Sequence, residues 1–326
     1  MTPIQGSHSY FSMKVLLTGI TGNLGFEVAR ALQMRGAEIV PVMRDVSSLQ
    51  LLGLGIKKAV EGNLFTGDIK ADFGSVDCIF HCAGNVHFEK AGDTNFEMMR
   101  TVTKIAKRLG VPIFYVSTAF LWRAEGSEET LRNSYEKDKY HSEELLRESG
   151  VTHSIFRPSV LVGHSHTGKL RNWSGYYLLV STFLEAAANG GNEKIRFPEL
   201  TGTSNMLPVD QAATVIAEKI MEQHYGKLWY VTNPEPPPAQ FVLGTTLESL
   251  GLAHRFECTP MGYDEYKKAS KTQEEEILAT AGRHFSPYWS LSYNFPESVC
   301  TENMITKKYL GKTLSCFTEA RNFKVV

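Results

Sequence analysis

A glycine-rich turn near the start of the chain constrains the fold more than any other feature of the sequence. The segment Gly19-Ile20-Thr21-Gly22-Asn23-Leu24-Gly25 stands between an apolar run at 15–17 and a helix-like stretch at 26–35. Glycine lets backbone N–H groups approach a ligand closely, and the following helix offers the positive end of its dipole. This order predicts a cradle for the diphosphate of a dinucleotide. The alternative is a turn that only ends a buried strand, since such a turn also favours glycine.

Apolar strand-like runs alternate with amphipathic helical ones from residue 14 to about 163. This alternation is typical of parallel βαβ units, so we expect an α/β fold with a doubly wound parallel sheet of the Rossmann type. The expected strands are 15–18, 38–43, 58–61, 78–81, 113–117 and 153–157. The expected helices are 25–35, 95–109 and 135–148.

The alternation ends after Gly163. We therefore expect a dinucleotide-binding domain at 13–165 and a smaller substrate-binding region at 166–326, with segments at about 205–232 returning to the sheet. Those segments are a helix near 210–222 and a strand near 229–231. The rest of the second region should hold an apolar helix at 176–188, a proline-rich linker at 234–238 and a charged helix at 264–281.

The composition excludes several classes of protein. A formal net charge of −1 argues against a general nucleic-acid binder. The cysteines show no paired spacing, which favours free thiols in a reducing compartment. Residues 1–12 lack a signal pattern and no apolar stretch is long enough to span a membrane, so we expect a cytoplasmic chain. His164 and His166 do not form a helical metal motif, so no metal is expected.

Tyr135 and Lys139 lie four positions apart in an expected helix, which places both side chains on one face. A nearby ammonium favours the phenolate, so the pair could give and take a proton at working pH. The alternative is a solvated pair on an ordinary amphipathic helix. Upstream, Ser117 and Thr118 end an expected strand, at the edge where open α/β sheets bind ligands. They could bond a substrate oxygen or only cap a turn.

The glycine turn, the strand-end hydroxyl and Tyr-x-x-x-Lys occur in an order that resembles the short-chain dehydrogenase/reductase superfamily, in its extended branch. The segments 77–84 and 157–163, together with Val209-Asp210, resemble the same family. The resemblance implies that Tyr135 is the proton donor or acceptor. It also implies that Lys139 binds the nicotinamide ribose and holds the pKa of Tyr135 down, and that Thr118 orients the substrate carbonyl. Asn95 stays outside the catalytic set, because helix capping explains it equally well.

The end of the second strand bears on the choice of nucleotide. Met43 cannot accept from a ribose 2′-hydroxyl, whereas Arg44 could pair with a 2′-phosphate, so NADP(H) is favoured over NAD unless Asp45 turns inward. Asn63 and Leu64 stand where relatives often carry Asp-Leu or Asp-Val beside the adenine. With these, the cofactor contacts that we expect are Gly19, Thr21, Gly22, Asn23, Leu24, Gly25, Arg44, Asn63, Leu64, Cys82, Ala83, Gly84, Tyr135, Lys139, Pro158, Ser159 and Val160.

Within the extended branch, the segments 115–120, 157–168 and 231–234 look most like thioester reductase and fatty acyl-CoA reductase (male-sterility type) domains. This resemblance implies an NADPH-dependent reductase of a carbonyl or acyl thioester, carried on coenzyme A or on a carrier protein. Extended-branch relatives often dimerise, so a homodimer is one state that the resemblance allows. Two alternatives stay open: a nucleotide-sugar epimerase or dehydratase with tightly bound NAD, and a non-catalytic NADP-sensing protein.

Overall fold

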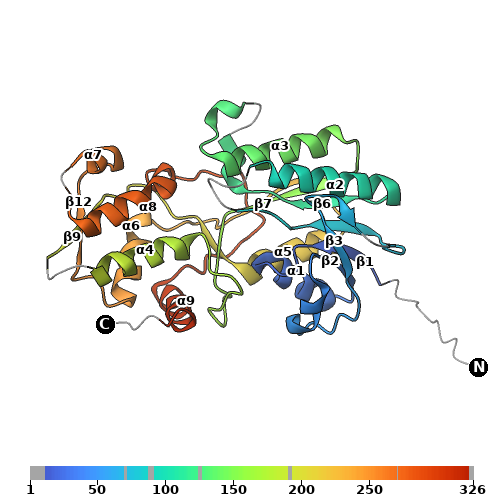
Figure 1. The fold of residues 1–326 in the computed structure, drawn as a ribbon, viewed down its shortest axis with the longest axis horizontal. Coiled ribbons are helices and arrows are strands. Elements are labelled where there is room, and N and C mark those ends of the chain that lie inside the picture. Colours follow the sequence, from blue (N-terminus) through green and yellow to red (C-terminus); the bar gives the residue numbers. More distant parts are fainter. Residues whose placement is uncertain are drawn as a thin grey trace, which may run out of the picture.

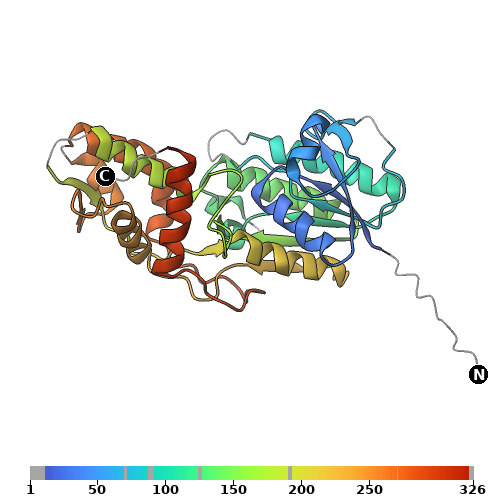
Figure 2. The ribbon, with the colours of Figure 1, turned by 90° about the horizontal axis from the view of Figure 1, so that it is seen from below.

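A computed structural model of the chain describes residues 12–69, 72–86, 92–123, 127–189, 193–269 and 271–322. These residues form two lobes that lie side by side (Figure 1). Figure 2 shows that the yellow-gold segment around residue 215 lies against the first lobe, although the chain on either side of it belongs to the second. The chain therefore crosses between the lobes more than once.

The first lobe is built on a sheet whose strands are parallel except at one edge, where β4 pairs antiparallel with β3. Strand order reverses between β1 and β5, and ligands bind at such a switch point in open α/β sheets. The α/β fold with a mainly parallel sheet is thus confirmed. In spatial order the strands are β11 (Leu228–Val231), β7 (His153–Pro158), β6 (Ile113–Val116), β5 (Cys78–His81), β1 (Lys14–Thr18), β2 (Glu38–Met43), β3 (Val60–Asn63) and β4 (Asp68–Ile69).

Helices cover both faces of this sheet (Figure 1). On one face α1 (Asn23–Gln33) packs with α5 (Val209–Met221), and a core formed with β1 includes Val28 and Ile216. On the other face α2 (Thr94–Leu109) packs with α3 (Ser134–Glu148), over a core that includes Met99 and Leu146. Because both faces are covered, the central strands are mostly apolar.

The second lobe has its own apolar core, to which Phe183, Phe256 and Phe317 contribute. Two short parallel ribbons support it, β8 (Val160–Val162) with β10 (Met206–Pro208) and β9 (Ile195–Pro198) with β12 (Phe256–Thr259). Its helices are α4 (Tyr176–Asn189), α6 (Ala239–Ser249), α7 (Tyr263–Lys268), α8 (Gln273–Trp289) and α9 (Lys307–Ala320). Short 3₁₀ helices in the part of the chain that the structure describes are η1 (Val46–Leu52), η2 (Ala119–Arg123) and η3 (Glu128–Thr130).

The single charged helix expected at 264–281 is wrong, because the structure has the separate helices α7 and α8 there. Ala269 is extended and ends α7, and Lys271 Nζ donates to the carbonyl of Lys267 at 2.6 Å. Thr272 then starts α8 with a capping box, its hydroxyl bonded to Glu275 N and the Glu275 carboxylate to Thr272 N. Reciprocal capping of this kind makes a new helix start.

The proline-rich linker at 234–238 leads directly into α6, whose N-cap is Pro238, and proline suits the start of a helix because its missing N–H would have no partner there. One other expectation for the second region needs correction. The segment His164-Ser165-His166, which reads as a rim loop, holds two buried residues. Ser165 donates from its N and Oγ to the Asp210 carboxylate at 2.7 and 2.5 Å, so the segment is tied to α5.

Candidate active site

A cleft of about 710 Å³ runs along the carboxyl ends of the strands in the first lobe. The expected cofactor residues that line it come from the turn after β1, the end of β2, β3 and the turn after β5. They are Gly19, Thr21, Gly22, Arg44, Asn63, Leu64, Cys82, Ala83 and Gly84. Ser48 and Phe65 also line the cleft, and the sequence analysis did not single them out. Both residues follow an expected strand within a few residues, and this position near a strand end is the sequence signal that could have identified them.

The glycine turn is built to hold a bound group close to the backbone. Gly19 has a φ of +82°, and a Cβ there would lie 2.5 Å from Ala83 N. A Cβ on Gly25 would lie 2.2 Å from Gly19 O. The turn therefore excludes side chains and leaves its N–H groups and the start of α1 facing the cleft, which fits a diphosphate.

The side chains of Asn23 and Leu24 lie elsewhere. Leu24 is buried in the apolar core, and Asn23 forms a reciprocal pair with Asn172, donating from Nδ2 to the carbonyl at 2.7 Å and accepting from the N–H at 2.8 Å. Only the backbone N–H groups of these two residues remain for a ligand. The Asn172 segment of the second lobe thus lies over the start of α1.

The end of β2 presents a cation to the cleft. Arg44 is exposed and has no hydrogen bond or ion pair with the part of the chain that the structure describes. Asp45 is occupied locally, because its carboxylate accepts from Ser47 N at 2.9 Å and Ser47 Oγ at 2.6 Å and caps η1. These bonds lower the pKa of Asp45.

Thr118, Tyr135 and Lys139 meet at the carboxyl end of β6. The phenol of Tyr135 is hydrogen-bonded to the Thr118 hydroxyl. Lys139 Nζ donates to Val116 O at 2.9 Å and to Tyr115 Oη at 3.2 Å. A Cβ on Gly84 would lie 3.3 Å from Lys139 Nζ, so the ammonium reaches the wall of the cleft. The sequence spacing therefore does bring these side chains together beside the nucleotide cleft.

The expectation that Lys139 holds the pKa of Tyr135 down is wrong. Burial raises the pKa of Tyr135 to about 12, although the bond to Thr118 acts the other way. Burial also lowers the pKa of Lys139 to about 8. Desolvation disfavours both charged forms, and the carboxylates of Glu136 and Asp138 raise the pKa of Tyr135 further. Tyr135 is therefore protonated at neutral pH, as an acid must be.

The helix that carries this pair is held by polar contacts that the sequence analysis missed. Asp138 accepts from Asn95 Nδ2 at 2.7 Å, Asn95 N at 2.9 Å and Phe96 N at 2.9 Å, which joins α3 to the start of α2. Glu136 accepts from the Tyr288 hydroxyl at 2.6 Å, which joins α3 to α8. The Asn95 side chain thus positions Asp138, and this contact is not explained by capping of α2.

Two buried hydroxyls at the site lack a partner. The Oγ atoms of Ser117, at the end of β6, and Ser159, just after β7, have no hydrogen-bond partner among the described residues. A buried hydroxyl without a partner costs free energy unless a ligand supplies one. An amide or carbonyl group bound between these strand ends would satisfy them, which fits a nicotinamide and its substrate. Pro158 lies in β7 beside Ser159, whereas Val160 lines a second cavity.

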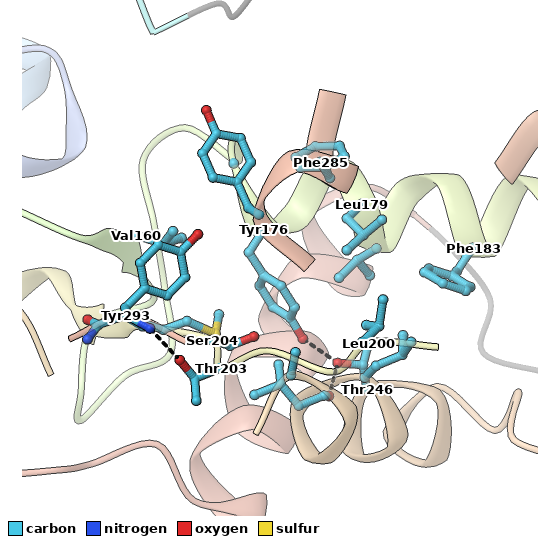
Figure 3. Close-up of a pocket in the computed structure, with 18 of the residues that line it drawn as sticks. Val160, Tyr176, Leu179, Phe183, Leu200, Thr203, Ser204, Thr246, Phe285 and Tyr293 are labelled. Carbon is cyan, nitrogen blue, oxygen red and sulfur yellow. Dashed lines mark hydrogen bonds between the residues drawn. The ribbon is translucent and has the colours of Figure 1, made fainter. Parts of the chain in front are cut away.

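That second cavity is lined almost entirely by apolar and aromatic groups (Figure 3). It has a volume of about 140 Å³ and lies mainly among α4, α6 and α8. Phe120 forms part of its wall, and Phe120 N donates to Thr118 Oγ1 at 3.4 Å. Tyr176 and Phe183 line the cavity, whereas Tyr177 is fully buried and bonded to Gly163 N. A substrate held at Thr118 could therefore extend into this space.

His81 on β5 makes the stability of the first lobe sensitive to acid. It is 1% exposed, and its Nδ1 lies 2.7 Å from Thr18 Oγ1. The Thr18 hydroxyl oxygen also accepts from Cys82 N and Ala83 N, so its proton is available to a neutral imidazole. Burial, followed by the charge of Lys139, lowers the pKa of His81 to about 3.

We expect this histidine to cost stability below pH 6.5, its unfolded pKa. Below that pH the unfolded chain binds a proton that the folded chain does not. The free energy of unfolding therefore decreases as the pH is lowered, by about 2 kcal/mol at pH 5. Urea unfolding of the wild type and of His81→Gln at pH 7 and pH 5 measures this. Between pH 7 and pH 5 the variant should lose less free energy of unfolding than the wild type. An equal loss in both proteins would refute the assignment.

Among the described residues, no cluster of His, Cys, Asp and Glu could hold a metal ion. Within the same residues, no helix has the length and apolar character needed to cross a bilayer. All the cysteines are free thiols.

Comparison with known proteins finds a family match for part of the chain. Residues 63–216 match the NAD-binding family described as Male sterility protein. A linear gramicidin synthase polypeptide of Brevibacillus parabrevis is 25% identical over 339 residues, covering 87% of this chain but only 6% of that protein. The chain thus spans a small fraction of the curated relative that it matches.

Solved reductase domains share the whole fold. The terminal R domain from the myxalamid PKS-NRPS biosynthetic pathway has a TM-score of 0.73 at 18% identity, covering 96% of this chain and 92% of that one. A thiolation-reductase di-domain from an archaeal non-ribosomal peptide synthetase has a TM-score of 0.72 at 15% identity, covering 96% and 76%. At these identities the likeness establishes the fold.

The fold and the family match are those of enzymes of the extended short-chain dehydrogenase/reductase branch. The chain carries a thioester reductase-like NAD(P)-binding domain, and its residues 63–216 match the male-sterility type.

Proposed function

We propose that this enzyme reduces an acyl thioester to an aldehyde with NADPH. The observation that carries the proposal is the Thr118–Tyr135 hydroxyl pair. Lys139, one helical turn after Tyr135, reaches the wall of the nucleotide cleft at Gly84. Phe120, whose N–H donates to Thr118, lines an apolar cavity. An acyl group in the cavity would place its carbonyl against these hydroxyls. The likeness to a thiolation-reductase di-domain supports the thioester class.

The residues of the site suit a reaction that develops negative charge on oxygen. When bound, the reduced nicotinamide supplies a hydride, so that thioester, NADPH and a proton yield aldehyde, thiol and NADP⁺. Thr118 and Tyr135 donate to the carbonyl oxygen as its charge grows, and Tyr135, protonated at neutral pH, provides the proton. Lys139 keeps Val116 O and Tyr115 Oη as fixed partners and offers a further N–H to a ribose hydroxyl.

We propose NADPH in place of NADH because Arg44 is unpaired with any described residue and Asp45 is used in capping. Arg44→Ala is expected to weaken NADPH binding about 10- to 100-fold, the usual effect of losing a charge-assisted bond to phosphate. NADH binding should change less than about threefold. Fluorescence titration of both nucleotides measures this, with Arg35→Ala, just beyond the C-terminal end of α1, as a control. Equal losses for NADPH and NADH would contradict the assignment.

The thioester would arrive on coenzyme A or on a carrier protein, by analogy with the thiolation-reductase di-domain. A cytoplasmic location would supply NADPH and keep the free thiols reduced. The homodimer stays a prediction, to be checked by light scattering of the purified chain.

The proposal is tested by incubating the enzyme with NADPH and octanoyl-CoA. Loss of reduced nicotinamide absorbance should equal the free thiol released and the aldehyde trapped. Copurified NAD, no net nucleotide consumption and interconversion of a nucleotide sugar would favour an epimerase. NADPH binding without turnover of any thioester, aldehyde or ketone would favour a sensor. The Thr118–Tyr135 pair beside an apolar space supports the reductase over both.

A further inference from the structure

The cavity beside Phe120 has a wall without charge. None of its described lining residues is ionic, and they come from η2, β8, α4, α6, α8 and the strand-and-loop segments near 200–206 and 293. Figure 3 shows Leu179, Phe183 and Leu200 gathered toward one end and Tyr293 and Val160 toward the other. The first end is remote from Thr118, and the second is near it through Phe120.

Several polar side chains in the cavity wall already have partners. Tyr176 Oη lies 2.6 Å from Thr246 Oγ1, which itself donates to Val242 O at 2.6 Å. Asn205 exchanges hydrogen bonds with the backbone of Asn233. A charged group entering this space would lose its hydration and find no counter-ion, which is strongly unfavourable. The wall therefore selects an uncharged chain.

The size of the cavity limits the length of that chain. A cavity of about 150 Å³ lined by leucine, isoleucine and phenylalanine binds one benzene molecule, and this cavity measures about 140 Å³. It therefore accommodates a group of roughly six carbon atoms.

The far wall separates the cavity from a smaller hollow of about 10 Å³. Leu179, Phe183, Leu200 and Leu243 line both spaces, whereas Leu278 lines only the smaller one. Removing part of the shared wall would join the two spaces and lengthen the cavity. Leu200 is 7% exposed and belongs to no helix or strand, so truncating it changes no helix or strand backbone.

We propose that the cavity binds the end of an uncharged alkyl or aryl acyl chain of medium length, and that Leu200 with Phe183 sets the upper limit of chain length. This inference rests on the proposed function, because it names the substrate class of that site. The carbonyl would lie at Thr118 and the chain would pass Phe120 into the space among α4, α6 and α8.

The test is a series of N-acetylcysteamine thioesters with acetyl, butanoyl, hexanoyl, octanoyl and dodecanoyl groups, together with adipoyl, which carries a terminal carboxylate. We expect kcat/KM to rise about fourfold per methylene up to hexanoyl or octanoyl, from the transfer free energy of a CH₂ group. It should fall for dodecanoyl and be at least about 100-fold lower for adipoyl than for hexanoyl. A flat series, or a preference for adipoyl, would overturn the proposal.

Substitutions test whether the wall shared with the smaller hollow sets the limit on acyl chain length. Leu200→Ala should move the optimum toward dodecanoyl, whereas Leu278→Ala, which removes the same atoms from the smaller hollow alone, should leave it unchanged. Ala239→Leu fills the cavity from α6 and should move the optimum toward butanoyl, so the proposal stays testable if Leu200→Ala does not fold. Equal optima in all these proteins would contradict the assignment.

Calorimetric binding of the same thioesters separates this inference from the proposed function. Chain-length-dependent binding without turnover would refute the reductase and retain the apolar chain site. Turnover with no dependence on chain length would retain the reductase and refute the site.

Discussion

Replacing Tyr135 with phenylalanine is expected to lower kcat for thioester reduction by about 10³-fold, within the range typical of a lost general acid. The substitution removes only the hydroxyl. Phenylalanine keeps the ring that packs at the end of β6, so folding and NADPH affinity should change little. Because the bond between Tyr135 and Thr118 is also lost, the effect should appear in kcat rather than in KM for the nucleotide.

Tyr140→Phe is the matched control, since Tyr140 lies on the same helix and borders His141 instead of the site. It should keep wild-type kcat. Steady-state rates and fluorescence titration of NADPH on the two variants provide the measurement. A Tyr135→Phe enzyme with the wild-type rate would remove the proposed proton donor from the mechanism.

Replacing Glu143 with glutamine is expected to reduce the free energy of unfolding by about 3–5 kcal/mol, the usual result of breaking a buried ion pair. Glu143 on α3 is fully buried and accepts from Arg157 Nε at 2.9 Å and Arg157 NH2 at 2.8 Å. The glutamine would leave the Arg157 charge, whose side chain is 5% exposed, without its carboxylate.

Glu144→Gln is the control for this prediction. Its exposed carboxylate pairs with Arg147, and exposed pairs contribute about 0–1 kcal/mol. Urea unfolding of the two variants gives the comparison. The double variant Glu143→Leu, Arg157→Met should recover part of the loss, because no charge is then left buried. A loss below about 1 kcal/mol in Glu143→Gln would show that this pair does not fix α3 to β7.

The Rossmann sheet could be predicted from the sequence because its strands are short apolar runs separated by helix-like segments. The run 38–43 forms β2 with the same bounds. The strand expected near 229–231 returns to the sheet as β11 (Leu228–Val231), which pairs with β7. A strand was expected at residues 58–61, whereas β3 begins at Val60 in the structure. A strand start depends on pairing with β2, which local sequence does not specify.

The anchoring of α3 could not be predicted, because its buried face is polar. Glu136, Asp138, Lys139 and Glu143 are all nearly inaccessible, yet their pattern reads as a solvated surface. Their partners Asn95, Arg157 and Tyr288 are distant in sequence. Only the fold brings such charges together with the groups that satisfy them.

The pKa of Tyr135 illustrates the same limit. Sequence spacing reveals the nearby Lys139, but it does not reveal that both groups are buried, and burial decides the direction of both shifts. In contrast, the capping role of Asp45 could have been recognised from Ser47 two residues later, since Asp at an N-cap is a local signal.

The most direct test of the central claim uses NADPH carrying deuterium at the transferable position, with an acyl thioester as the partner. Mass spectrometry of the trapped product should find one deuterium on the aldehyde carbon for each thiol released, and Tyr135→Phe should form neither product at a comparable rate. Deuterium that stays on the nucleotide, or a thiol released without labelled aldehyde, would contradict reduction at this site.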